Sequence, residues 1–70
     1  MTRIAESAEM VEVSCELRRE TDRALLIHDG TREIWVPKSQ CQWGDDGAPA
    51  DGKAGTLYVA RWMAKREGLI

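Results

Sequence analysis

The segment VEVSCELR, residues 11–18, alternates strictly between apolar and polar side chains. Successive side chains of a β-strand point to opposite faces of the sheet, so this period of two predicts a strand with one buried face. The pattern begins at Met10, after a polar start over residues 1–8 that is expected to be frayed or to extend a sheet edge. The rest of the fold is predicted around this strand.

Two further strands are predicted on either side of the dipeptide Asp29-Gly30. They cover residues 24–28 and 32–36, and both are rich in β-forming side chains. Asp-Gly between such runs is a strong hairpin signal, because glycine accepts the positive φ that tight turns need. Pro37 lacks a backbone N–H, so it is expected to end the third strand or to occupy an unpaired edge.

Other polar stretches predict further turns. In RRETDR, residues 18–23, the side chains of Thr21 and Asp22 can bond nearby backbone amides and close a first hairpin. The segment PKSQ, residues 37–40, fits a short helical turn or a corner between strands. Residues 42–43 are then expected to resume an extended conformation.

The last third of the chain predicts a loop, a strand and a helix. Residues 44–55 contain four glycines, three aspartates and one proline, which is typical of a mobile loop. A short strand is expected over residues 56–59. The segment ARWMAKREG, residues 60–68, predicts a helix of about two turns with Gly68 as its C-cap and with Trp62 in the core.

These elements predict an α+β fold, mainly β, formed by a single domain over residues 1–70. We expect a small antiparallel β-meander or barrel of about four to five strands, SH3-like or partial OB-like, with a C-terminal helix. Closing the sheet would remove exposed edges, and the alternative is an open sheet with the helix packed across one face. A chain of this size hides only about 60% of its unfolded surface, so a stability of roughly 5 kcal/mol is expected.

Charge and cysteine content limit the classes of function. The formal net charge is -2 and the sequence pI is about 5.3, which argues against wrapping duplex nucleic acid by phosphate neutralisation alone. Residues 1–10 contain no apolar run typical of a signal peptide, so a reducing cytoplasm is the expected location. A bridge between Cys15 and Cys41 would require neighbouring strands to align them. No segment approaches the ~20 apolar residues of a membrane span.

The stretch ETDRALLIHDGTREIWVPKSQ, followed after a loop by TLYVARWMAKREGLI, resembles a family of small uncharacterised phage, prophage and bacterial proteins. The likeness covers about residues 20–70 and centres on a Trp-x-Pro-Lys-Ser-Gln motif. The matching residues are Glu20, Thr21, Trp35, Pro37, Lys38, Ser39, Gln40, Trp62, Gly68 and Leu69. Ala60 departs from the proline that often opens the last helix, and Cys41 and Trp43 replace simpler apolar and acidic residues.

The resemblance brings no assigned activity, but it implies a phage-like context. In that context a small protein is expected to inhibit a host defence or replication complex, as an anti-CRISPR protein does. Catalytic chemistry is not indicated: His28 is the only histidine, and no nucleophile such as Ser39 or Cys41 stands next to it in sequence. Cysteine and histidine also lack the paired spacing of zinc sites, so we expect no enzyme, no metal and no cofactor.

The tryptophans are the best candidates for binding. If Ile34 and Val36 point into the core, Trp35 points outward, where it either contacts a partner or lies beneath the helix. Trp43 borders the loop and is expected either to cover one end of the barrel or to stand exposed. The predicted protein-contact residues are Trp35, Trp43, Lys38, Asp45 and Asp46.

We therefore expect a small non-enzymatic binding protein that acts as a monomer or homodimer and inhibits a host protein complex. A defence complex that itself binds nucleic acid is one such partner. The alternative is a single-stranded nucleic-acid-binding module that combines basic groups with aromatic stacking. Interleaved acidic residues oppose this alternative, since they indicate ordinary cross-strand pairing. The nucleic-acid candidates are Arg18, Arg23, Arg32, Lys38 and Tyr58.

Overall fold

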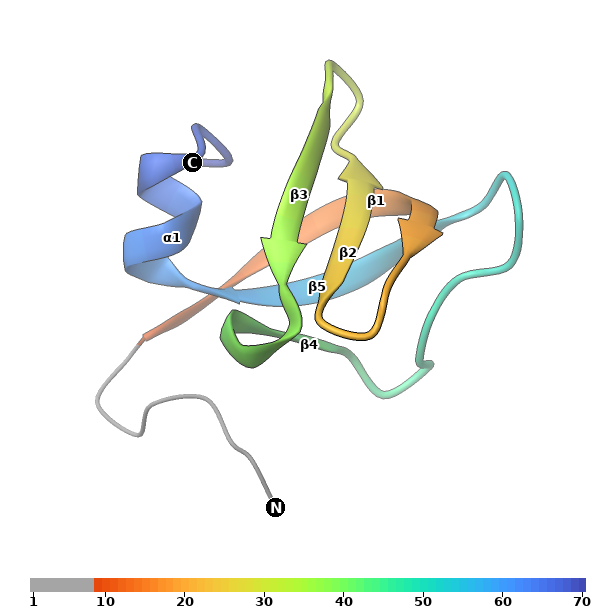
Figure 1. The fold of residues 1–70 in the computed structure, drawn as a ribbon, viewed down its shortest axis with the longest axis horizontal. Coiled ribbons are helices and arrows are strands. Elements are labelled where there is room, and N and C mark those ends of the chain that lie inside the picture. Colours follow the sequence, from red (N-terminus) through yellow and green to blue (C-terminus); the bar gives the residue numbers. More distant parts are fainter. Residues whose placement is uncertain (1–8) are drawn as a thin grey trace.

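A computed structural model describes residues 9–70, which form five strands, a 3-10 turn and one helix (Figure 1). The elements are β1 (Met10–Glu20), β2 (Ala24–His28), β3 (Glu33–Pro37), η1 (Lys38–Gln40), β4 (Cys41–Trp43), β5 (Ala54–Ala60) and α1 (Arg61–Arg66). The predicted class, a small antiparallel and mainly β α+β fold with a C-terminal helix, is confirmed. The expectation for residues 1–8 lies outside the described range.

All strand pairs are antiparallel, in the order β3-β2-β1-β5-β4. β1 is 11 residues long and pairs with two strands. Its first part pairs with β5 and its last part pairs with β2. The two parts meet at Glu16, which is opposite both His28 and Ala54. A β-bulge between Leu17 and Arg19 follows, and in Figure 1 β2 and β3 cross steeply over β1 and β5.

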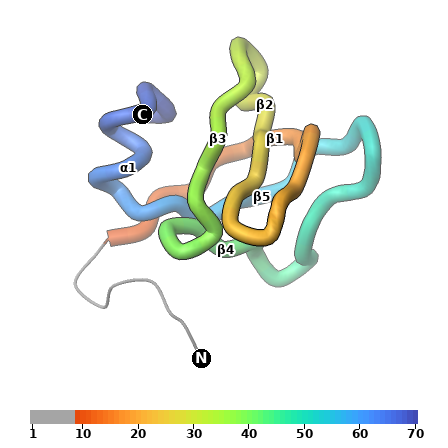
Figure 2. Tube along the Cα trace, in the orientation of Figure 1, coloured from red at the N-terminus to blue at the C-terminus, as the bar shows by residue number. Residues whose placement is uncertain are grey.

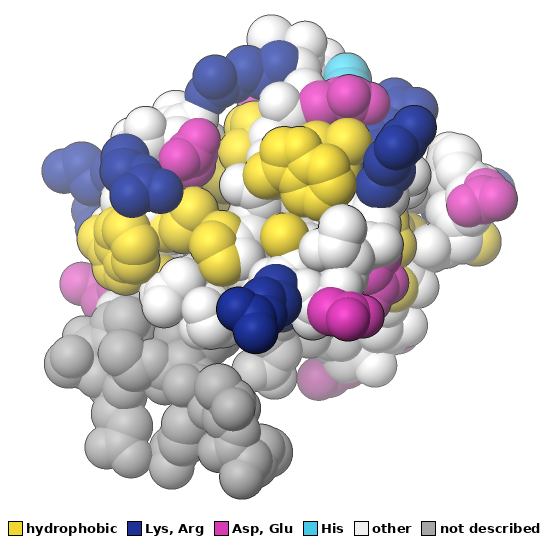
Figure 3. All heavy atoms as spheres, viewed as in Figure 1, with side chains coloured by type: hydrophobic (Ala, Val, Ile, Leu, Met, Phe, Trp, Pro, Cys, Tyr) yellow, Lys and Arg dark blue, Asp and Glu magenta, His cyan; other side chains and the backbone are white. Residues whose placement is uncertain are grey.

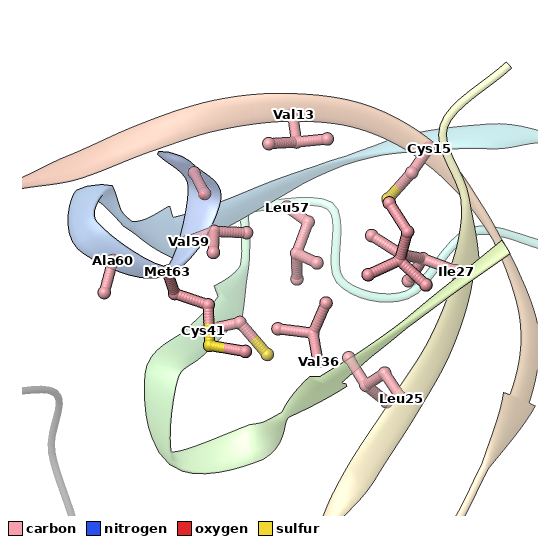
Figure 4. Packing of buried hydrophobic residues seen from close by; sticks show 12 residues of the cluster. Val13, Cys15, Leu25, Ile27, Val36, Cys41, Leu57, Val59, Ala60 and Met63 are labelled. Carbon is pink, nitrogen blue, oxygen red and sulfur yellow. The ribbon is translucent and has the colours of Figure 1, made fainter. Parts of the chain in front are cut away.

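The core fills the space between these two halves of the sheet (Figure 4). Val13 and Cys15 point inward from β1, as the alternation predicts, and Leu57 and Val59 do so from β5. The remaining members of the cluster are Leu25, Ile27, Ile34, Val36, Cys41, Ala60, Met63 and Ala64. Every element except η1 therefore contributes a side chain to one shared interior.

The hairpin between β2 and β3 has the chemistry that its sequence predicts. The Asp29 carboxylate accepts hydrogen bonds from the backbone N–H groups of Thr31, at 2.9 Å, and Arg32, at 3.0 Å. These two bonds, that of Arg32 first, lower the pKa of Asp29 below its usual value. Gly30 has a φ of 100°, which confirms the need for glycine in this turn.

The two other predicted turns are also present. The Thr21 hydroxyl oxygen accepts hydrogen bonds from the N–H groups of Arg23 and Ala24, which closes the connection between β1 and β2. Pro37 ends β3, and the residues after it form the short 3-10 turn η1. The Lys38 N–H then donates to the Arg23 carbonyl at 2.7 Å, which ties this corner to the first turn.

The boundaries of β5 differ from the prediction. The strand begins at Ala54 and not at residue 56, because β1 pairs with Ala54 and Gly55 as well. The loop before it is tied back to the sheet, since the Gly44 N–H donates to the Thr56 carbonyl at 2.9 Å. A Cβ atom on Gly55 would lie 3.0 to 3.1 Å from the Pro49 ring, so the loop packs closely over the strand.

The helix α1 ends in a Schellman motif, as the sequence predicts for Gly68. The Gly68 N–H donates to the Lys65 carbonyl at 3.2 Å, and the Leu69 N–H donates to the Ala64 carbonyl at 2.8 Å. Gly68 has a φ of 76°. The Arg32 guanidinium donates a hydrogen bond to the Glu67 carbonyl, which connects the β2–β3 hairpin to this end of the helix.

The prediction that Trp62 lies in the core is wrong, because its side chain is 51% exposed. α1 begins directly after Ala60, which is fully buried, and this junction fixes the orientation of the helix. Met63 and Ala64 therefore face the core, and Trp62 points away from it. The Arg66 guanidinium instead lies over the Trp62 ring, 5.4 Å from its centroid.

We expect Gly68→Ala to lower the free energy of unfolding by roughly 1 to 2 kcal/mol, because alanine is strained at a positive φ. The added Cβ would also lie 2.6 Å from a terminal nitrogen of Arg32 and would displace its hydrogen bond. Urea denaturation followed by tryptophan fluorescence measures the change. Gly68→Asn is the control and should lose less, and an alanine variant as stable as the parent would contradict the assignment.

Candidate functional site

The outer face of β3 carries Trp35. Its neighbours Ile34 and Val36 are buried in the core, while Trp35 points outward and is 48% exposed. Figure 3 shows hydrophobic side chains over β3 and α1 on this side of the molecule, with Lys and Arg side chains around them. Of the two positions that the sequence allows for Trp35, the exposed one is observed.

Trp35 stands beside a second apolar residue, Leu26 of β2, which is its direct cross-strand partner. Leu26 lies outside the core cluster and yet is only 9% exposed. Its other cross-strand partner is Arg19 of β1. Side chains that are directly opposite share a face of the sheet, so Arg19, Leu26 and Trp35 form a row across three strands.

Ion pairs flank this row. The Arg18 guanidinium lies 3.5 Å from the Glu16 carboxylate and 3.9 Å from that of Glu33, and the Lys38 ammonium lies 2.6 Å from the Glu20 carboxylate. Such exposed pairs contribute about 0 to 1 kcal/mol to stability. Glu16 and Glu33 thus share the Arg18 cation, and Glu20 pairs with Lys38.

Arg19 differs from these neighbours. Its side chain is exposed and forms no ion pair or hydrogen bond with any residue in the range 9–70. Strict alternation along β1 would turn Arg19 to the same side as Val13 and Cys15. The bulge after Leu17 reverses the alternation and places Arg19 on the outer face, so its position could not be predicted from the pattern alone.

The predicted protein-contact residues do not share one surface. Trp43 is opposite Leu57, is partly buried and packs against the core cluster, so it covers part of the core. Asp45 and Asp46 lie in the loop after β4, over the outer face of β1 and β5. Of the other predicted contact residues, only Lys38 lies next to β3, the strand that carries Trp35.

The loop and the strands below it enclose a polar groove of about 360 Å³. Glu12 and Tyr58, which are cross-strand partners, line its floor, and Asp45, Asp46 and Lys53 line its wall. Within residues 9–70, no group of three or more His, Cys, Asp or Glu residues is placed to hold a metal ion.

The predicted nucleic-acid residues are also dispersed. Arg18 and Lys38 are engaged in ion pairs, and Arg32 donates to the Glu67 carbonyl. Arg23 is in the turn before β2, and Tyr58 lies in the groove on the other half of the sheet. The structure therefore does not collect these groups into one basic face with aromatic platforms.

His28 lies in a hairpin turn, and the two cysteines lie in the core. The Nδ1 atom of His28 accepts a hydrogen bond from the Gly30 N–H at 3.1 Å, within the hairpin turn. Cys15 and Cys41 are buried and free, and β5 separates their strands. Burial raises the pKa of both thiols to about 11, so they are protonated at neutral pH and are poor nucleophiles.

Comparison of the chain with protein-family models, with curated proteins and with solved structures finds no match. Within residues 9–70, no helix has the length and apolar character needed to cross a membrane. Function therefore has to be inferred from the exposed side chains and their chemistry.

We expect the free energy of unfolding to fall as the pH rises from about 9 to about 11. The unfolded chain releases the thiol protons near pH 9, whereas the folded chain keeps them until about 11, so the folded state loses roughly 2 kcal/mol per thiol across this window. Urea denaturation at a series of pH values measures the slope.

The control is the double variant Cys15→Ala and Cys41→Ala. It should be less stable at neutral pH, because each substitution opens space in the core, but it should lack the part of the slope that the thiols cause. An identical slope in both proteins would contradict the assignment of buried, protonated thiols.

Proposed function

We propose that this chain is a small non-enzymatic binding protein whose contact surface is the outer face of β2 and β3, centred on Trp35. The observation that carries the proposal is the half-exposed Trp35 side chain beside the outward-facing but nearly buried Leu26. In the phage-like context that the resemblance of residues 20–70 implies, such binding would inhibit a host protein complex, in the manner of an anti-CRISPR protein.

The surroundings of Trp35 support a protein partner. Tryptophan is enriched in the binding hot spots of protein interfaces, where a large rigid ring fills a pocket of the partner. Trp35 is held in a strand that pairs with β2 along its whole length, so little freedom is lost on binding. The paired charges of Arg18 and Lys38 form a polar rim of the kind that surrounds such anchors.

Single-stranded nucleic acid is a weaker candidate for this face. Modules of that class stack successive bases on several aromatic side chains along a basic groove. Here Trp43 packs on the core and Tyr58 lies in the polar groove, so neither extends the surface around Trp35. The carboxylates of Glu16, Glu20 and Glu33 would also repel phosphates.

A binding role without catalysis is consistent with the reactive groups. His28 is engaged in a turn, and the two cysteine thiols are buried with raised pKa values. The one histidine and the two thiols are thus used in folding.

The test is affinity capture from a bacterial lysate with three immobilised proteins: the parent, Trp35→Ala and Trp62→Ala. Trp62 is a matched control, since it is 51% exposed and Trp35 is 48% exposed. Quantitative mass spectrometry should show a captured protein that is reduced at least about tenfold by Trp35→Ala, because truncation of a central tryptophan costs more than about 1 kcal/mol.

Trp62→Ala should capture that protein as the parent does. Capture that is unchanged by Trp35→Ala would reject the proposed surface. An equal loss with both variants would reject a contact surface confined to β2 and β3, because it would assign α1 the same share of the binding.

A further inference from the structure

We infer that the partner presents an acidic peptide segment to this face, with a carboxylate bound by Arg19 and an apolar side chain packed against Trp35 and Leu26. This inference rests on the proposed function and adds the chemical class of the partner. It also assigns a binding role to Arg19, which lies outside both sets of predicted contact residues.

The register of the strands fixes the spacing of the two anchors. Arg19 is opposite Leu26 and Leu26 is opposite Trp35, so the three residues lie on one line perpendicular to the strands. Adjacent strands are about 4.8 Å apart, which places the Cα atoms of Arg19 and Trp35 about 10 Å from each other. An extended segment that crosses β1, β2 and β3 can therefore reach both anchors with side chains two to four residues apart.

The pairing of charges favours a carboxylate as the group that Arg19 binds. The carboxylates of Glu16 and Glu33 lie within 4 Å of one shared cation, Arg18, and that of Glu20 lies within 4 Å of Lys38. Arg19, in contrast, has no such partner among residues 9–70, and it stands at the edge of an apolar surface. A guanidinium in this position binds a carboxylate through two parallel hydrogen bonds, which adds geometric specificity to the attraction.

A peptide fits this arrangement better than a nucleic-acid strand does. A strand carries a phosphate at every nucleotide and would have to pass the carboxylates that flank the row. A peptide can place one carboxylate at Arg19 and uncharged side chains beside Glu20 and Glu33. Among residues 9–70, Trp35 is the only tryptophan or tyrosine on the outer face of β2 and β3, which likewise suits one apolar anchor and not a series of stacked bases.

The test uses a displayed library of random peptides, selected in parallel on the parent protein, Arg19→Glu, Trp35→Ala and Lys53→Glu. Lys53→Glu is the matched charge reversal, since Lys53 is exposed but lines the groove on the other half of the sheet. Arg19, Trp35 and Lys53 are all exposed, so the variants should fold, and amide NMR spectra verify this before selection.

We expect the parent and Lys53→Glu to enrich peptides that combine Asp or Glu with an aromatic or large aliphatic residue. Arg19→Glu should instead enrich Lys or Arg at the acidic position. Trp35→Ala should lose the enrichment. Synthetic peptides selected on the parent should bind Arg19→Glu at least about tenfold more weakly, which corresponds to about 1.4 kcal/mol.

The outcomes separate the inference from the proposed function. If Arg19→Glu selects the same acidic peptides as the parent, or if the parent shows no acidic preference, the acidic partner is rejected while the Trp35 surface stands. If Trp35→Ala and the parent select the same peptides, both are rejected. Salt-sensitive binding of oligothymidylate that requires Arg19 would assign the face to nucleic acid and would overturn the inference.

Discussion

A single strand, β1, belongs to both halves of the sheet, and the other elements are placed by it directly or through one neighbour. Its first part holds β5, and β5 in turn holds β4 and leads into α1. Its last part holds β2, which holds β3. The bulge between Leu17 and Arg19 lets one strand pair within both halves of the sheet, because an extra residue bends a strand and increases its twist.

The same bulge links the fold to the candidate function. Before the bulge, the apolar residues of β1 face the core and the charged ones face solvent. After it the alternation is reversed, so that Arg19 joins Leu26 and Trp35 on the outer face. The assembly of this surface is thus a consequence of one local departure from regular pairing.

The core of this chain is small, and the exposed tryptophans are large apolar side chains that the fold does not use fully for stability. Full burial of one large apolar side chain stabilises a fold by about 1.5 to 3 kcal/mol, a considerable part of the few kcal/mol that keep a domain of this size folded. The structure nevertheless leaves Trp35 and Trp62 about half exposed. For Trp62 the Arg66 guanidinium over its ring is a local explanation. Among residues 9–70, no cation lies over the Trp35 ring in this way, and the exposed ring is the basis of the proposed contact surface.

Features that depend on neighbours in sequence could be predicted, and features that depend on distant pairing could not. The turns at Thr21 and Asp29 follow from side chains that bond the nearby backbone. The corner after Pro37 follows from the missing N–H of proline, and the cap at Gly68 follows from the positive φ that glycine accepts. The start of β5, by contrast, is set by its pairing with β1. The orientation of Trp62 depends on the buried junction before α1.

The candidate site shows the same division. That Trp35 faces away from the core follows from its place between Ile34 and Val36, since side chains alternate along a strand. The row that it forms with Leu26 and Arg19 depends on two registers and a bulge, which no local pattern encodes. For a similar reason, Trp43 could be assigned to the edge of the core only from its pairing with Leu57.

The most direct test of the central claim is the accessibility and electrostatic environment of Trp35 itself. A variant with Trp43→Phe and Trp62→Phe retains Trp35 as its only tryptophan, and its fluorescence can be quenched with neutral acrylamide, iodide and caesium ions. If Trp35 is an exposed anchor beside Arg19, which has no ion pair with residues 9–70, acrylamide will quench it efficiently and iodide will quench it more than caesium does. Weak quenching by all three, or stronger quenching by caesium, would contradict the account.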